Sequence, residues 1–202
     1  MTTPSSGLPT GQLTHEKLAE VFVALADTLV DDYDVVELME RLTQASVELL
    51  GAAAAGLMIV DLRGSVQVIA SSSEQMHLLD VLQVQVDEGP CLDCVHSGAA
   101  VGVTDLREEP QRWPAFSPVA LEAGFTGVLA LPLRLRAETL GALNLFFTGS
   151  GLSEPEQRIA QALADVATIG VLQQRAVHRG AVVAEQLQRA LNSRVVIEQA
   201  KG

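Results

Sequence analysis

Residues 127–147 read GVLALPLRLRAETLGALNLFF. Two apolar runs, Gly127–Leu135 and Thr139–Phe147, lie on either side of the short turn Arg136-Ala137-Glu138. Long apolar runs joined by a short polar turn are typical of two buried, antiparallel strands. The segment therefore predicts a β-hairpin.

A second hairpin precedes this one in the chain. The run 54–61 is apolar up to Asp61 and has the length of a strand, and Arg63-Gly64 marks a tight turn after it. Residues 66–70 follow as a second, paired strand, and a brief strand is expected at 100–103. Together these segments predict an antiparallel sheet.

Helical periodicity flanks the sheet segments on both sides. From Thr14 to Val30 apolar residues recur at three- and four-residue steps, which predicts an amphipathic helix. A second helix is expected from Asp34, as N-cap, to the C-cap Gly51. After the hairpins, Ser153-Glu154-Pro155-Glu156 combines a Ser N-cap with a capping-box Glu, and the helix that it begins meets no further proline.

The order of the elements predicts an α+β fold with the N- and C-terminal helices on one face of an antiparallel sheet. The other face is left to residues 72–126. In that segment we expect short helices at 73–82, 91–97 and 119–123, and a proline-rich loop over 105–118. A ligand pocket is expected between this face and these segments.

Composition excludes several classes of protein. The 202 residues are 48% hydrophobic and 19% charged, so the chain can form a core. No run is long enough to span a bilayer, and the N-terminus lacks the features of a secretory signal. Two cysteines three residues apart do not make a disulfide framework. We therefore expect a cytoplasmic protein without a membrane partner, with a disordered tail over residues 1–13.

The charge is distributed unevenly along the chain. From Gln173 onward there are five basic residues and two acidic ones, a net charge of +3. Because the whole chain has a net charge of −12, the residues before Gln173 carry −15. An acidic body repels nucleic acid. Any contact with a polyanion is therefore expected at the C-terminal end.

Three motifs resemble GAF domains of bacterial regulators, in the expected order and spacing. Residues 87–94, DEGPCLDC, are similar to the "GEGPC-D" turn of these domains. The runs 112–116 and 123–133 resemble them further, and 140–146 resembles the returning strand. The resemblance implies a PAS-related GAF sensor domain over residues 14–172 that binds a small molecule not identified by the sequence. The cyclic-nucleotide type is disfavoured because its Asn-Lys-x-x-Phe-Asp-Glu run is missing.

Residues 187–202, LQRALNSRVVIEQAKG, are similar to the opening of an ANTAR domain, the RNA-binding output module of transcription-antitermination regulators. The resemblance implies that residues 173–186 form a connecting helix and that Arg189, Arg194 and Lys201 belong to the RNA-output helix. Most of the ANTAR bundle is missing, so we expect a truncated domain. RNA binding is expected from the complete ANTAR domain and not from this chain alone.

Cys91 and Cys94 form a C-x-x-C pair followed by His96 after one residue. A zinc site needs about four protein ligands, and there is no second pair, so no metal site is predicted. The cysteines are either small apolar residues in the core or a redox pair, and Asp87, Glu88 and Asp93 oppose a lowered thiol pKa.

Trp113 and Phe116 lie among prolines and either line a pocket or cover the core. With Cys91, Cys94 and His96 they are our candidate ligand-pocket residues. No nucleophile elbow, phosphate loop or His-Glu-x-x-His motif is present, so no catalytic residue is predicted and the chain is not expected to be an enzyme.

The long C-terminal helix carries a heptad seam that begins at Ile159. We expect its first part, as far as about Gln173, to pack on the chain's own sheet. The later part has apolar residues and no sheet left to cover, which favours a homodimer. The predicted dimer seam comprises Val177, Ala184, Leu187 and Leu191.

The two resemblances imply the signal-sensing GAF domain of a cytosolic regulator that controls transcription antitermination through an RNA-binding ANTAR output. Two alternatives remain open. One is a GAF-fold thiol enzyme that resembles free methionine sulfoxide reductase and uses Cys91 or Cys94. The other is a ligand-free GAF domain that serves as a dimerisation scaffold.

Overall fold

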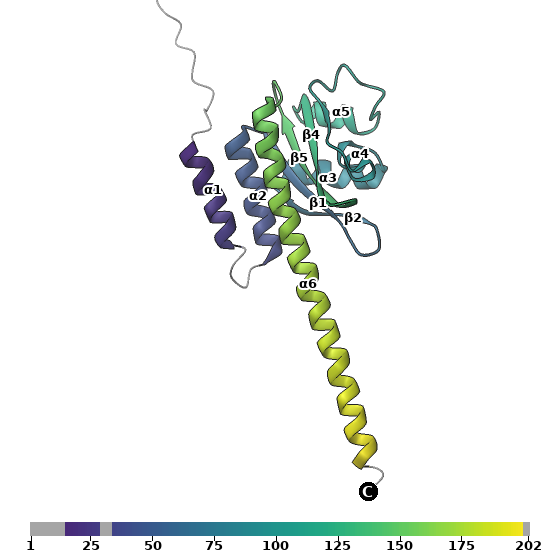
Figure 1. Cartoon of the computed structure of the whole chain (residues 1–202). Coiled ribbons are helices and arrows are strands. Elements are labelled where there is room, and N and C mark those ends of the chain that lie inside the picture. The colour runs from purple at the N-terminus through teal and green to yellow at the C-terminus, as the bar shows by residue number, and fades with distance from the viewer. Residues whose placement is uncertain (1–14, 29–33, 200–202) are drawn as a thin grey trace, which may run out of the picture.

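The computed structural model describes residues 15–28 and 34–199, with side chains described over 16–27 and 34–177. Its centre is a five-stranded antiparallel sheet whose strands lie side by side in the order 66–71, 54–60, 138–147, 127–135 and 101–103. Helices cover both faces of this sheet (Figure 1). The tail expected at residues 1–13 lies outside the described residues. The predicted α+β fold with an antiparallel sheet and a long C-terminal helix is confirmed.

Both predicted hairpins are present. β4 (Gly127–Leu135) and β5 (Glu138–Phe147) pair from Gly127 opposite Phe147 to Leu135 opposite Glu138. β1 (Ala54–Val60) pairs with β2 (Val66–Ser71) on one side and with β5 on the other. β3 (Val101–Val103) adds a short edge strand next to β4. The two hairpins therefore meet along β1 and β5, at the middle of the sheet.

One face of the sheet is covered by α2 (Val35–Leu50) and the first part of α6 (Glu154–Gln199), and α1 (His15–Thr28) packs against α2 (Figure 1). The predicted caps form: the Asp34 carboxylate accepts the Val36 N–H at 2.8 Å, and Gly51 has a left-handed φ of 62°. Ser153 donates its backbone N–H to Glu156 at 2.8 Å, which is half of the predicted capping box.

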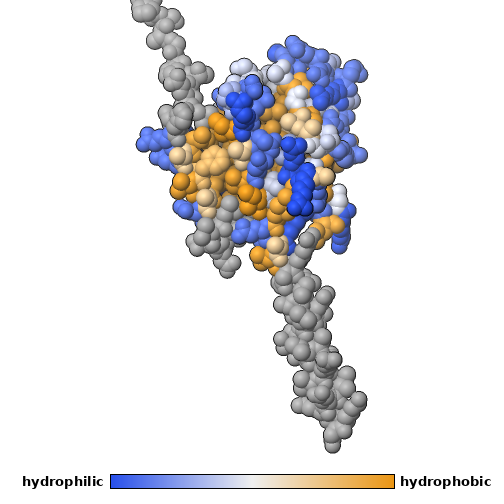
Figure 2. All heavy atoms as spheres, in the orientation of Figure 1, coloured by the Kyte–Doolittle hydropathy of each residue, from blue (hydrophilic) through white to orange (hydrophobic). Residues whose placement is uncertain are grey.

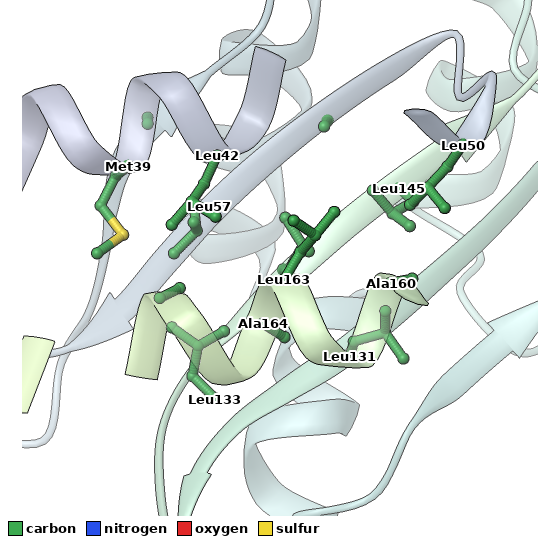
Figure 3. Packing of buried hydrophobic residues seen from close by; sticks show 14 of the residues in the cluster. Met39, Leu42, Leu50, Leu57, Leu131, Leu133, Leu145, Ala160, Leu163 and Ala164 are labelled. Carbon is green, nitrogen blue, oxygen red and sulfur yellow. The ribbon is translucent and has the colours of Figure 1, made fainter. Parts of the chain in front are cut away.

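The core beneath these helices consists of aliphatic side chains. Leu42 of α2, Leu57 of β1, Leu145 of β5 and Leu163 of α6 are buried and converge between the helices and the sheet (Figure 3). Gly170 of α6 lies directly on α2, where a Cβ atom would approach the Leu38 side chain to 2.5 Å. The first part of α6 thus packs on its own domain.

The opposite face carries α3 (Glu74–Val86), α4 (Pro90–Ser97) and α5 (Phe116–Glu122). α3 runs four residues beyond the end predicted at 82, and Asp87 ends it in a left-handed conformation with φ of 53°. α5 begins at Phe116 and not at 119, because the Glu88 carboxylate accepts the N–H groups of Ala115 and Phe116 at 2.8 and 3.0 Å. A carboxylate at this position satisfies donors that a helix N-terminus leaves free.

Beyond the sheet, α6 extends away from the domain as a single helix (Figure 1). At Val177, which is 65% exposed, the side chains of α6 no longer belong to the core. Over the described residues, no helix has the length and apolar content needed to cross a membrane.

Candidate functional site

The candidate site lies between the sheet and α3, on the face away from α6. Asp80 of α3 is fully buried there, and the side-chain amide of Asn144 in β5 donates to it at 2.9 Å. Gln83, one turn further along α3, donates to the same Asp80 oxygen at 3.2 Å, and the Ser71 hydroxyl of β2 lies 3.5 Å from the other oxygen. Three side chains, from β5, α3 and β2, thus surround the Asp80 carboxyl group.

A glycine makes room for this cluster. Gly56 of β1 lies opposite Asn144 in the sheet register. A Cβ atom at Gly56 would come within 2.0 Å of the Asp80 carboxyl oxygen. The β1–β5 pairing therefore sets both the donor and the space that Asp80 occupies.

Burial raises the pKa of Asp80 to about 8, because the charged carboxylate loses its hydration. The hydrogen bonds from Asn144 and Ser71 lower it only in part. None of the ion pairs among the described residues includes Asp80. At neutral pH most molecules therefore carry Asp80 in its neutral, protonated form.

One acceptor of the cluster is left without a donor in the described part of the chain. The Asn144 Oδ1 atom is buried and has no hydrogen-bond partner among the described residues. An unpaired buried acceptor costs free energy, of about 1–3 kcal/mol in mutational series. A group that brings an N–H or O–H donor to this point would recover that cost.

Gln83 links the cluster to the cysteines. Its side-chain oxygen accepts the Cys91 N–H at 2.9 Å, at the start of α4. Both cysteines are buried and unbridged. Burial raises the pKa of Cys91 well above its usual value and that of Cys94 to about 12. Because the thiolate is the reactive form, neither cysteine is a ready nucleophile in this conformation.

Trp113 and Phe116 fill the space beside this cluster. Both are buried, with ring centroids 6.1 Å apart in an edge-to-face arrangement, and Phe116 also contacts Phe146 of β5. The Trp113 indole N–H donates to Asp93 at 3.0 Å, and the Arg112 guanidinium lies 4.6 Å above the ring. Four of the five candidate pocket residues therefore belong to one buried cluster, and His96 lies outside it as an exposed residue.

Sequence reasoning missed the central residues of the site: Gly56, Asp80, Gln83 and Asn144. A signal was present, because Asp80 interrupts the apolar run Leu78-Leu79-Asp80-Val81-Leu82 and Asn144 interrupts the apolar strand β5. A polar residue inside an apolar segment is informative because buried polar groups need partners.

Other predicted residues fall beyond the described side chains. Ala184, Leu187 and Leu191 of the dimer seam, and Arg189 and Arg194 of the RNA-output helix, lie on the described backbone of α6 only. Lys201 lies outside the described residues altogether. In the part of the chain whose side chains are described, no group of three or more His, Cys, Asp or Glu residues is arranged to hold a metal ion.

Comparison with known proteins gives a family and a fold. Residues 32–171, more than half of the chain, match the family model described as GAF domain. No curated protein matches the sequence.

Solved structures of low sequence identity share the fold. The GAF domain of a phosphoenolpyruvate-protein phosphotransferase from Coxiella burnetii is 20% identical over 82% of this chain and 98% of its own, with a TM-score of 0.62. The corresponding domain from Acinetobacter is 11% identical over 81% and 97%, with a TM-score of 0.63. Free methionine-R-sulfoxide reductase from Neisseria meningitidis, solved in complex with its substrate, is 16% identical over 87% and 98%, with a TM-score of 0.62.

Proposed function

The chain belongs to the GAF domain family, and we propose that it is the sensor domain of a cytosolic regulator and not an enzyme. The observation that supports this most is the buried Asp80–Asn144 pair, with an acceptor that has no partner among the described residues. A domain that only held a scaffold together would not need such a cluster, because replacing all members of a buried polar network by well-packed apolar residues is often neutral or stabilising. A polar cluster under α3 is instead suited to a small molecule that presents N–H or O–H donors.

Ligand entry requires movement, because side chains fill the space around the cluster. Trp113, Phe116 and Met76 are buried there. Displacement of α3 would open the cluster at Asp80, and the same strand that carries Asn144 borders the core beneath α6. We propose that ligand binding shifts the population of two such arrangements and thereby the geometry of α6.

The domain is proposed to act as a homodimer. Figure 2 shows apolar side chains gathered over α1 and α2. The exposed apolar residues of the helices on this side of the sheet include Val23 of α1, Val36 of α2 and Ile169 of α6. An exposed apolar patch of this kind is typical of an interaction surface. Together with the predicted seam that begins at Val177, this patch supports a dimer in which two copies of the chain pair through α1, α2 and α6.

The output is proposed to be RNA binding that controls transcription antitermination. Its support is the resemblance of residues 187–202 to the opening of an ANTAR domain. We expect a regulator that carries a complete ANTAR domain to shift RNA hairpins in a mobility assay and the 202-residue chain not to do so. Tight, specific RNA binding by the 202-residue chain would contradict this division of roles.

Ligand sensing is tested by thermal unfolding in the presence of small molecules with amide or amine N–H groups. At least one is expected to raise the Tm of the wild type and to leave the Tm of Asn144→Leu unchanged, because binding to the native state alone stabilises it. Ser46→Ala, a change beneath the helical layer, is the matched control and should keep the response. A wild-type Tm that no compound moves would contradict the proposal.

A ligand-free dimerisation scaffold is the second candidate. It is favoured by the complete filling of the site by Trp113, Phe116 and neighbouring side chains. Dimerisation in light scattering together with no response to any compound would support it.

The reductase alternative is weakened by the buried thiols of Cys91 and Cys94, whose pKa values are raised. Turnover of free methionine sulfoxide that is lost in a Cys91→Ser/Cys94→Ser double variant would restore it.

A further inference from the structure

Helix α3 buries two polar residues and exposes three apolar ones. Asp80 and Gln83 are fully buried beneath it, whereas Leu78 is 63% exposed and Val84 and Val86 are exposed as well. A surface helix ordinarily shows the reverse arrangement. The outer side of α3 therefore carries apolar side chains that nothing in the described chain covers, next to the exposed polar residues Gln75, His77 and Gln85.

α5 lies beside α3 and forms the second wall of a groove. The Gln75 side chain donates to the Ala123 carbonyl at 3.0 Å and ties the two helices together. Between them is an open hollow of about 500 Å³, lined mainly by Leu78, Val81, Leu82 and Val119. Val119 of α5 is 41% exposed, so the apolar surface continues across both helices.

The charges that frame this groove have a single sign. Glu74 stands at the first turn of α3, Asp87 caps its other end, and Glu122 lies in α5, and all three are exposed. The sequence contains no Lys or Arg from Gly64 to Leu106 or from Trp113 to Leu133. The groove is thus lined mainly by apolar side chains, with Gln75 and Gln85 among them, and is acidic at both ends.

We propose that the groove between α3 and α5 is a docking surface for an amphipathic helix of a partner protein, with basic residues at both ends of its apolar face. α3 has 13 residues and is therefore about 20 Å long, which suits three to four turns of a docked helix. Helices that bind in grooves place apolar anchors at three- and four-residue steps, and charges at the rim fix their register.

Charge decides between this occupant and others. A second copy that docked through the same groove would bring Glu74, Asp87 and Glu122 of both copies together, which like-charge repulsion opposes. An anionic lipid surface is opposed for the same reason. A basic helix satisfies both the apolar surface and the acidic ends.

The probe is a fluorescently labelled synthetic helix of about 15 residues, with Leu and Ala on one face, Gln on the other and two Lys at each end. We expect saturable binding to the full chain with one peptide per chain. The same peptide with Glu in place of Lys should not bind. A double variant, Leu78→Asp/Val119→Asp, should weaken binding at least about tenfold, since it places charges at the centre of the contact.

Two further variants complete the design. Leu62→Asp, in the exposed turn between β1 and β2, is the matched control and should bind as the wild type does. Glu74→Gln/Asp87→Asn should weaken binding at low salt and reduce its salt dependence, because the rim charges are removed; Asn at 87 tolerates the left-handed backbone.

Circular dichroism and unfolding curves establish that each variant folds. Equal affinity of the wild type and the Leu78→Asp/Val119→Asp variant would overturn the proposal. Conversion of a dimer to a monomer by Leu78→Asp would also overturn it, by assigning the groove to a second copy.

Discussion

The two faces of the sheet bury polar groups in different ways. Under α1, α2 and α6, the buried hydroxyls of Ser46 and Thr168 each donate to a carbonyl four residues earlier in their own helix, at 2.7 and 2.9 Å. Under α3, Asp80 depends on Asn144, which lies 64 residues away in the sequence. The first face satisfies its polar groups locally and is filled by aliphatic packing. The second face holds a cluster that only the assembled fold can satisfy.

This difference indicates that the first face serves the stability of the domain and that the second face is suited to conformational change. A core whose polar groups are satisfied locally stays intact when neighbouring elements shift, whereas a cluster shared by three elements changes energy when any one of them moves. A conformational change at the second face can therefore be coupled to a ligand or a proton, while the helical face holds the domain together.

Leu163→Ala should produce the largest loss of stability, because it disrupts the core between the helices and the sheet. Removal of a fully buried leucine from α6 leaves a cavity and should lower the free energy of unfolding by about 3–5 kcal/mol. Urea denaturation followed by circular dichroism measures it. Gln174→Ala, at an exposed position of the same helix outside the predicted dimer seam, serves as control; a loss of stability equal to that of Leu163→Ala would contradict this assignment.

Asp80→Asn should stabilise the protein increasingly as pH rises. The pKa of Asp80 is raised in the native state, so the native state binds the proton more tightly than the unfolded state does, and wild-type stability falls between about pH 4 and pH 8. The asparagine cannot ionise. We expect the variant to gain roughly 2–4 kcal/mol relative to the wild type between pH 5 and pH 8.

Urea unfolding at both pH values measures this gain, and Glu74→Gln on the outer side of α3 is the matched control. A difference between Asp80→Asn and the wild type that stays constant with pH would count against a buried neutral carboxyl.

Glu88→Ala should cost about 1–2 kcal/mol. The substitution removes the acceptor for the N–H groups of Ala115 and Phe116 and so frees the start of α5. Hydrogen exchange of these two amides should accelerate in the variant, while amides of α2 keep their protection. Unchanged exchange at Phe116 would show that α5 does not depend on Glu88.

Ser46→Ala should have the smallest effect, within about 0.5 kcal/mol. Ser46 is fully buried, yet its hydroxyl serves only a carbonyl of its own helix, and loss of that bond leaves the helix ladder intact. Denaturation curves that overlay those of the wild type would sharpen the contrast with Asp80. If Ser46→Ala lowered the free energy of unfolding by several kcal/mol, the two faces would not differ in this respect.

Local features of the fold could be predicted from the sequence. Asp34 and Gly51 end α2 where the sequence places its caps, and the hairpin turns fall between the apolar runs, because caps and turns depend on a few adjacent residues. The start of α5 was misplaced, because Glu88, 27 residues before Ala115, provides its cap. Contacts of that length leave no periodic signal.

The centre of the candidate site could not be predicted for the same reason. Sequence motifs pointed to Cys91, Cys94, Trp113 and Phe116, which do lie beside the cluster. The partner of Asp80 was set by which residue of β5 stands opposite Gly56 in the sheet register. That register follows from the whole sheet and not from either segment alone.

The protonation of Asp80 can be measured directly by a carbon-13 NMR titration of its side-chain carboxyl in the full chain. A midpoint near pH 8 is expected, and it would establish that the second face buries a neutral carboxyl group with Asn144 as its donor. A midpoint near the ordinary value of 3.8 would show that Asp80 is solvated and ionised, and it would contradict the contrast between the two faces of the sheet.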